Sequence, residues 1–168
     1  MNIQELAEYY VIAPNYQIPS LVVSDLRQLI LELGQTELQG IEINYVDFIP
    51  YLNGSELSLE EVFADFNRGK LMITTQFNES DLFGSEVNLI FRAIHEVHHL
   101  KLNVGFDWEG EFATAVHLIS LTDNLLFKQI LFSETIGQVA VRMHTGRFPY
   151  PQKVVLFELQ VLQELGIS

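Results

Sequence analysis

The chain contains no cysteine among its 168 residues. Disulfide bonds, zinc sites built from thiolates and iron–sulfur clusters are therefore excluded. A metal site in this protein would have to be made from histidine and carboxylate side chains. The five histidines and 22 acidic residues are its source of ligands.

Basic residues are also scarce. Nine lysines and arginines stand against 22 acidic residues, which leaves a net charge of −13. A nucleic-acid-binding surface needs basic groups to displace phosphate counterions, so we expect no nucleic acid partner. The same imbalance argues against electrostatic docking on anionic lipid. Any contact with a membrane would have to be hydrophobic.

A long uninterrupted apolar run is missing as well. The most apolar stretch, residues 116–132, is broken by polar residues, among them Asp123 and Lys128, and does not read as a transmembrane span. Residues 1–13 are acidic and lack the basic flank of a secretory or transit peptide. We therefore expect a cytoplasmic protein. Its hydrophobic fraction of 48% indicates either a large helical core or apolar surface left for a lipid, a partner or a pocket.

The sequence shows no repeats and no long linker, so we expect a single domain over residues 1–168. Helical periodicity dominates, and we predict an all-α fold, an irregular helical bundle. The expected helices cover residues 3–12, 21–33, 59–66, 85–103, 110–132, 133–143 and 152–165. Residues 40–51 could be extended or irregular. Residues 70–77 would suit a strand but have no evident partner.

Four helix boundaries have local signals. Ser20 is expected to cap the second helix and Gly34 to end it. Ser58 and Glu61 have the spacing of a capping box. Gly105 is a plausible stop for the helix over residues 85–103.

The helix over residues 85–103 is apolar nearly all round and should be buried. Four polar residues, Asn88, Arg92, His95 and His99, fall within a sector of roughly 60° on its helical wheel. Buried polar groups need partners, because leaving them unsatisfied is costly. This polar stripe is the candidate site.

His95 and His99 lie four residues apart and can aim two imidazoles at one point, as a divalent metal requires. Glu111 follows after eleven intervening residues, in the expected first turn of the next helix, and could be the third ligand. Glu109 could take its place. The structural alternative is two imidazoles bonded to the backbone or to each other, with Glu111 favoured by the helix dipole.

Glu96 could be a fourth ligand or a base acting on metal-bound water, and Arg92 could pair with an anionic substrate group. The alternative is an ordinary helical ion pair between these two residues. His98 lies beside His99 and could support the site from outside the ligand set. His117 and His144 are expected to be structural.

Two known site types share part of this pattern. His95-Glu96-x-x-His99 is the signature of zinc metallopeptidases, but no further histidine follows at the required spacing, and Ala115 stands where a later Glu-x-x-x-Asp pattern would need an acid. Glu96-x-x-His99 is half of a di-iron carboxylate motif, and the second Glu-x-x-His is missing.

Residues 92–118 resemble the signature of the fourth coenzyme Q (ubiquinone) biosynthesis protein family, which is His-Asp-x-x-His, eleven residues and then Glu. His95, His99 and Glu111 keep that spacing, and Gly110 precedes the final Glu. Glu96 replaces the family's Asp, and the chain is shorter than typical members. By this resemblance the chain would be a divergent, short member.

The resemblance implies a helical domain with a metal, usually zinc, held by His95, Glu96, His99 and Glu111. It also implies a lyase-type role in ubiquinone or prenylquinone biosynthesis, the removal of the C1 carboxyl group of a polyprenylated ring, with Glu96 and Arg92 as catalytic residues. The implied partners are a prenylated aromatic or isoprenoid lipid, a membrane contacted peripherally, a biosynthetic complex and further copies of the chain. Two alternatives stay open: a non-enzymatic lipid-binding scaffold with a structural metal, and a zinc metallopeptidase.

Overall fold

The computed structural model describes residues 1–54 and 56–167, and most of them are helical. The mostly helical architecture confirms the expectation from the sequence, but two short β-sheets depart from an all-α fold. The chain divides into two compact units, residues 1–18 with 104–168 and residues 19–103. Among residues 1–54 and 56–167, no helix has the length and apolarity needed to cross a bilayer.

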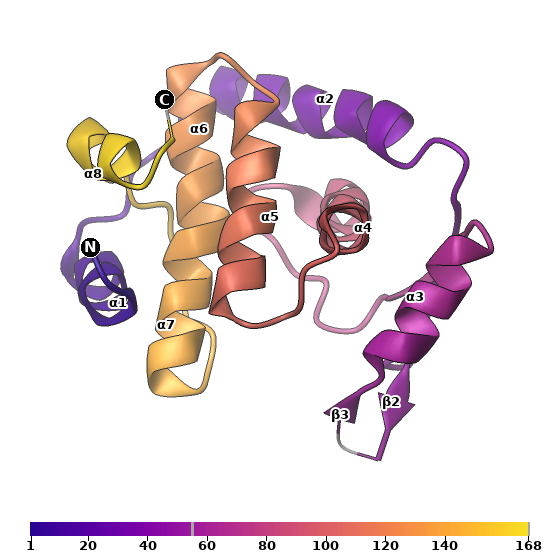
Figure 1. The fold of residues 1–168 in the computed structure, drawn as a ribbon. Helices are drawn as coiled ribbons and strands as arrows, with labels where there is room; N and C mark the ends of the chain where they lie inside the picture. The colour runs from indigo at the N-terminus through magenta and orange to yellow at the C-terminus, as the bar shows by residue number, and fades with distance from the viewer. Residues whose placement is uncertain (55, 168) are drawn as a thin grey trace. The chain divides into compact units, whose positions relative to one another are not determined.

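The first unit contains both ends of the chain. Its elements are α1 (Ile3–Ile12), α5 (Trp108–Ser120), α6 (Leu125–Phe132), the π-helix η1 (Ser133–Gly137), α7 (Gln138–Thr145) and α8 (Leu159–Glu164). The segments α6, η1 and α7 follow one another without a break, and α5 runs beside α6 (Figure 1). The helix expected over residues 110–132 is therefore two helices. Asn124 separates them, because its side chain accepts from the backbone N–H groups of Leu126 and Phe127 and caps α6.

The N-terminal helix is held to the C-terminal segment by hydrogen bonds around Tyr10. The Tyr10 hydroxyl donates to the carbonyl of Lys153 at 2.6 Å and accepts from the Lys153 N–H at 3.1 Å. The Lys153 ammonium donates to the Val11 carbonyl at the end of α1. Residues 152–158 belong to no helix or strand, so the last helix begins only at Leu159, later than the sequence predicts.

The second unit combines helices with a small parallel sheet. Its elements are α2 (Ser20–Glu37), β1 (Glu42–Val46), β2 (Leu52–Asn53), β3 (Glu56–Leu57), α3 (Leu59–Asn67), β4 (Lys70–Thr74) and α4 (Gly84–Leu102). β1 pairs in parallel with β4, from Glu42 opposite Lys70 to Val46 opposite Thr74, and β2 pairs antiparallel with β3. The missing partner of the 70–77 strand is thus the extended part of residues 40–51. Parallel pairing needs a crossover, which the β2–β3 hairpin and α3 provide.

The core of this unit lies between the sheet, α3 and α4. Its buried members are Tyr51, Val62, Leu71, Ile73, Ala93, Val97 and Leu100. The burial expected along all of α4 is concentrated from Ala93 to Leu100, and residues 87–92 are only partly buried. The polar residues within or beside this buried stretch, rather than the whole helix, need partners.

The expected cap and end of α2 and the stop expected at Gly105 are wrong for identifiable reasons, whereas α4 matches its expected range to within one residue at each end. Ser20 is the first helical residue rather than a cap, and the helix continues past Gly34 to Glu37. Gly34 is there for close packing, because a Cβ at this position would lie 2.6 Å from Cγ2 of Ile90 on α4. α4 ends at Leu102, and its C-terminal cap is not Gly105 but Asn103, whose φ of 54° is left-handed.

Ser58 caps α3 as expected, and its hydroxyl accepts from the Glu61 N–H at 3.4 Å. The reciprocal bond of a capping box would go to the N–H of Ser58. That N–H instead donates to the carbonyl of Tyr51 at 2.7 Å. Only half of the predicted box is therefore present.

Gly34→Ala should destabilise the protein by about 1–3 kcal/mol, the usual range for an overpacked contact. A loss of stability would point to the packing contact, because replacing glycine by alanine in an unobstructed helix interior normally stabilises the helix. Urea unfolding would measure the change. Ile90→Ala, which removes the clashing methyl group, should make Gly34→Ala much less harmful, whereas equal effects in both backgrounds would contradict the packing explanation.

Candidate functional site

The first candidate site is the pair His95 and His99 on α4. Their Nε2 atoms lie 3.1 Å apart, and the His99 side chain is fully buried. The two residues are one helical turn apart, so the helix itself brings the rings together. The structure thus bears out the placement of these two imidazoles on one face.

The orientation of the two rings suits convergence on a common point. Their planes are nearly perpendicular, at 81°, and their centroids lie 4.7 Å apart. A head-on contact would add a ring radius at each end of the 3.1 Å nitrogen separation and would hold the centroids further apart. Two lone pairs facing each other repel, so a proton on one ring or a cation has to lie between the nitrogens.

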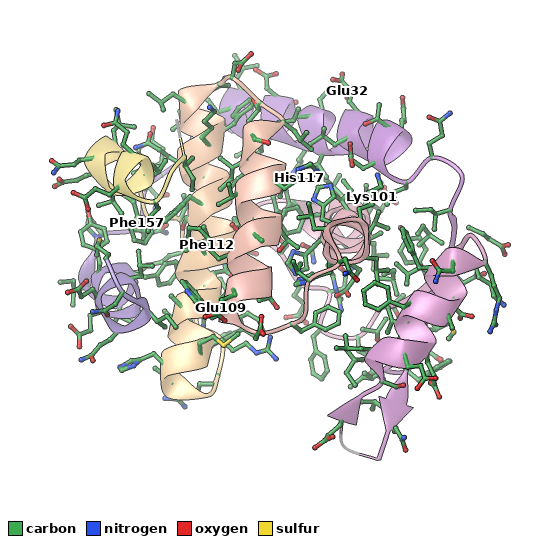
Figure 2. The ribbon with its side chains drawn as sticks, in the orientation of Figure 1. Glu32, Lys101, Glu109, Phe112, His117 and Phe157 are labelled. Atoms are coloured by element: carbon green, nitrogen blue, oxygen red, sulfur yellow. The ribbon has the colours of Figure 1, made fainter. Side chains whose placement is uncertain are left out.

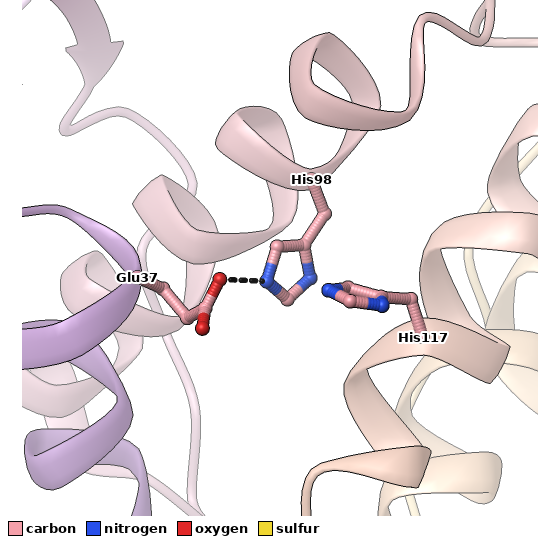
Figure 3. A group of neighbouring side chains, drawn as sticks. All are labelled: Glu37, His98 and His117. Atoms are coloured by element: carbon pink, nitrogen blue, oxygen red, sulfur yellow. Dashed lines mark hydrogen bonds and ion pairs between the residues drawn. The ribbon is translucent and has the colours of Figure 1, made fainter.

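A second pair, Glu37 and His98, joins the C-terminal ends of α2 and α4. Nε2 of the fully buried His98 lies 3.1 Å from a carboxylate oxygen of Glu37, as Figure 3 shows. The Lys101 ammonium donates to the same oxygen at 3.0 Å and to the Glu37 carbonyl at 2.8 Å. No local pattern predicts this partner of His98, because Glu37 lies 61 residues away along the chain.

Glu37 carries its negative charge in this cluster. Burial alone would raise the pKa of its carboxyl group, but the hydrogen bonds and positive charges of Lys101 and His98 outweigh burial and lower the pKa. A charged Glu37 accepts a hydrogen bond from Nε2 of His98, so that this nitrogen carries a proton. A carboxylate that orients an imidazole in this way is the usual support of a metal-ligating or proton-transferring histidine.

The other half of the polar stripe binds a loop. Arg92 donates to the carbonyl of Gln76 at 2.8 Å, and the Asn88 amide donates to the Asn78 side chain at 2.8 Å. Burial lowers the pKa of the Arg92 guanidinium, and the negative charge of Glu96 partly offsets this effect. The Arg92 side chain is thus held by its hydrogen bond to the Gln76 carbonyl and interacts electrostatically with Glu96. The partly buried Glu96 also helps to raise the pKa of Tyr51, after burial and the charge of Asp65.

Glu111 belongs to the first unit. It lies in the first turn of α5, as expected, and only 8% of it is exposed. Glu109 in the same turn is exposed, near the start of the helix in Figure 2. Of these two acids, Glu111 is therefore the buried one. His117 is in the last turn of α5, and His144 is an exposed residue in the last turn of α7.

The described residues include histidine and glutamate side chains grouped so that they could hold a metal ion. Within residues 19–103, the members of these groups are the pairs His95–His99 and Glu37–His98. The Lys101 ammonium already lies against the carboxylate of the second pair. His95 and His99 each present an imidazole nitrogen that can be neutral, as metal ligation requires. They are therefore the better start of a metal site.

The first unit contains an acid that the sequence did not single out. Glu134 lies in the π-helix η1, a helix type often associated with functional sites. Some of its side chain remains accessible to solvent, but burial of the carboxyl group raises its pKa to about 8, and the Gln138 amide partly offsets the rise. Its charge also contributes, after burial, to raising the pKa of Tyr10 to about 12.

Comparisons with family models, curated proteins and solved structures found no match to this chain.

Glu134 should make the protein less stable as pH rises. Its folded pKa of about 8 lies above the ordinary value of 4.5, so the folded state binds the extra proton between these values. The free energy of unfolding should fall by about 1.4 kcal/mol per pH unit in that window and level off above it. Urea unfolding at several pH values would measure this slope. Glu134→Gln should flatten it and the exposed control Glu8→Gln should not; an unchanged slope in Glu134→Gln would contradict the assignment.

Proposed function

We propose that this protein binds a divalent metal ion through His95 and His99 of α4 and Glu111 of α5. The observation that supports the proposal most strongly is the 3.1 Å separation of the two histidine Nε2 atoms. Two nitrogens at zinc distances of 2.0–2.1 Å in a tetrahedral site are about 3.3 Å apart, close to this value. A third, carboxylate ligand would leave one position open.

Zinc is the ion that we propose. The ligand set is nitrogen and oxygen without thiolate, which zinc accepts in three-ligand catalytic sites. The absence of a second Glu-x-x-His motif leaves no reason to invoke a di-iron centre. Glu111 is the proposed carboxylate because it is buried, whereas Glu109 is exposed.

We further propose that the metal centre serves chemistry of the ubiquinone or prenylquinone biosynthesis type, the decarboxylation or binding of a polyprenylated aromatic lipid. The support is the His95, His99 and Glu111 spacing together with the high hydrophobic fraction of the chain. When bound, the ion would supply Lewis acidity that stabilises negative charge on a carboxylate or phenolate oxygen.

Two protein groups beside the histidine pair have proposed roles. Glu96 is next to His95 on the same helix and would complete the ligand set or hold a proton. Arg92 is fixed by its bond to the Gln76 carbonyl, and a guanidinium has five N–H donors. Its remaining donors could orient an anionic substrate group.

Metal content gives the first test. Purified protein should contain close to one equivalent of zinc by plasma mass spectrometry, and His99→Ala or Glu111→Ala should weaken binding by more than about 100-fold, since even supporting residues cost 10–100-fold. The control His144→Ala, at an exposed helix end, should keep its metal. Cobalt substitution would report the ligand set by its visible absorption. Metal-free protein, or full retention by His99→Ala, would overturn the site.

Chelation separates a catalytic metal from the alternative, a non-enzymatic lipid-binding scaffold with a structural metal. A structural ion stabilises only the folded state, so its removal should lower the melting temperature by several degrees or unfold the protein. Removal of a catalytic ion should leave the fold largely intact. Mass spectrometry of co-purified lipid would then identify the bound class, and a protein free of prenylated or other lipids would argue against the lipid part of the proposal.

A further inference from the structure

The two-stranded parallel sheet of β1 and β4 is small for its type. Parallel sheets normally have several strands and helices on both faces, and two strands alone are marginal. Each strand here has one edge that its partner does not cover. The outer edges of β1 and β4 differ in whether another part of the chain forms hydrogen bonds with them.

The alternation of hydrogen bonds between β1 and β4 shows which backbone groups of β1 face away from β4. The Glu42 N–H donates to the Gly69 carbonyl at 2.8 Å, and the Thr75 N–H donates to the Val46 carbonyl at 2.7 Å. Because alternate residues of a strand face the same neighbour, Glu42, Asn44 and Val46 pair with β4. The backbone groups of Ile43 and Tyr45 point the other way. Within residues 1–54 and 56–167, no hydrogen bond reaches them.

The outer edge of β4 is closed by Tyr51. The Met72 N–H donates to the Tyr51 hydroxyl at 2.8 Å, and that hydroxyl lies 3.3 Å from the Asp65 carboxylate. Tyr51 is buried and held at a φ of 61°, an unfavourable conformation for a tyrosine. The edge of β4 is thus covered at the cost of local strain.

No hydrogen bond within residues 1–54 and 56–167 covers the outer edge of β1 in a comparable way. Proteins protect an open edge with lysine, proline, a bulge or a covering segment. Residues 43–46 contain neither lysine nor proline, and β1 and β4 pair in a continuous register without a bulge. Asn44 and Tyr45 are exposed, with 42% of Tyr45 accessible to solvent. The edge of β1 is therefore a template for another strand.

We propose that β1 pairs antiparallel with β1 of a second copy of this chain, about a two-fold axis at Asn44. Ile43 then lies opposite Tyr45 of the second copy, and Tyr45 opposite its Ile43. In an antiparallel ladder these would be hydrogen-bonded pairs, and Asn44 would face itself in the non-hydrogen-bonded position between them. This register uses every outward N–H and C=O group of Ile43 and Tyr45.

The side chains agree with this register. Ile43 packs against the core of its own unit, and Tyr45 lies on the same face, two residues along the strand. An aromatic opposite a β-branched residue is a favourable cross-strand pair. Glu42 falls opposite Val46, so that no like charges face each other.

The net charge of the chain and the Tyr51 contact on β4 predict how the dimer responds to salt and how many copies it contains. A net charge of −13 on each copy opposes association over longer range, so added salt should strengthen the dimer. Because the Tyr51 hydroxyl occupies the Met72 N–H in the middle of the outer edge of β4, a further strand should not pair along that edge of the four-stranded sheet. The assembly should stop at two copies. None of these residues is a proposed metal ligand, so the inference stands apart from the proposed function.

Cysteine cross-linking tests the register, because the chain has no cysteine of its own. Side chains in a non-hydrogen-bonded pair have Cβ atoms roughly 4.5–5.5 Å apart, within reach of a disulfide after a small adjustment. Asn44→Cys, oxidised with glutathione disulfide, should form a covalent dimer on a non-reducing gel. The matched control Glu42→Cys lies on the same strand and face, but its two copies would be four positions out of register and should remain monomeric. Equal cross-linking of both variants, or none in Asn44→Cys, would overturn the register.

Sedimentation equilibrium tests the association itself. The unmodified chain should be a dimer whose dissociation constant falls with added salt. Tyr45→Pro removes an outward N–H without touching the bonds to β4, and should weaken the dimer at least tenfold while the circular dichroism spectrum stays native. A monomeric unmodified chain, or a dimer that Tyr45→Pro leaves unchanged, would refute the proposal.

Discussion

The burial of α4 between Ala93 and Leu100 constrains the rest of the second unit. Apolar residues on this stretch form a common core with the sheet and α3. The same stretch carries His95, His98 and His99, and a buried imidazole needs a partner for its polar atoms. The partners come from the helix itself for the pair His95–His99 and from α2 for His98. Packing and polar chemistry are therefore coupled on one helix.

The neighbouring histidines have different environments. His98 meets a charged carboxylate that Lys101 also neutralises, so the cluster of Glu37, His98 and Lys101 joins the ends of two helices. His95 and His99 instead bring two nitrogens to 3.1 Å, which requires a shared proton or a cation. This difference is why the proposed metal centre involves His95 and His99, whereas His98 with Glu37 is assigned a supporting role.

Local signals predicted much of the helical structure. The helix over residues 3–12 matches α1, and the cap at Ser58 is present. Local signals failed where a distant contact decided the outcome. Gly34 looked like a helix stop, but it permits close packing against Ile90. The strand at residues 70–74 had no visible partner, because β1 precedes it by a whole crossover.

The sequence by itself determined the dominance of helix, the exclusion of thiolate chemistry and the placement of His95 and His99 on one face. These follow from composition and from the 3.6-residue period, which act within a few residues. Only the tertiary structure decided that His98 meets Glu37, that Arg92 is held by the loop at Gln76, and that β1 keeps an open edge while Tyr51 closes that of β4. Each of these depends on packing between segments far apart in the chain, which no local pattern encodes.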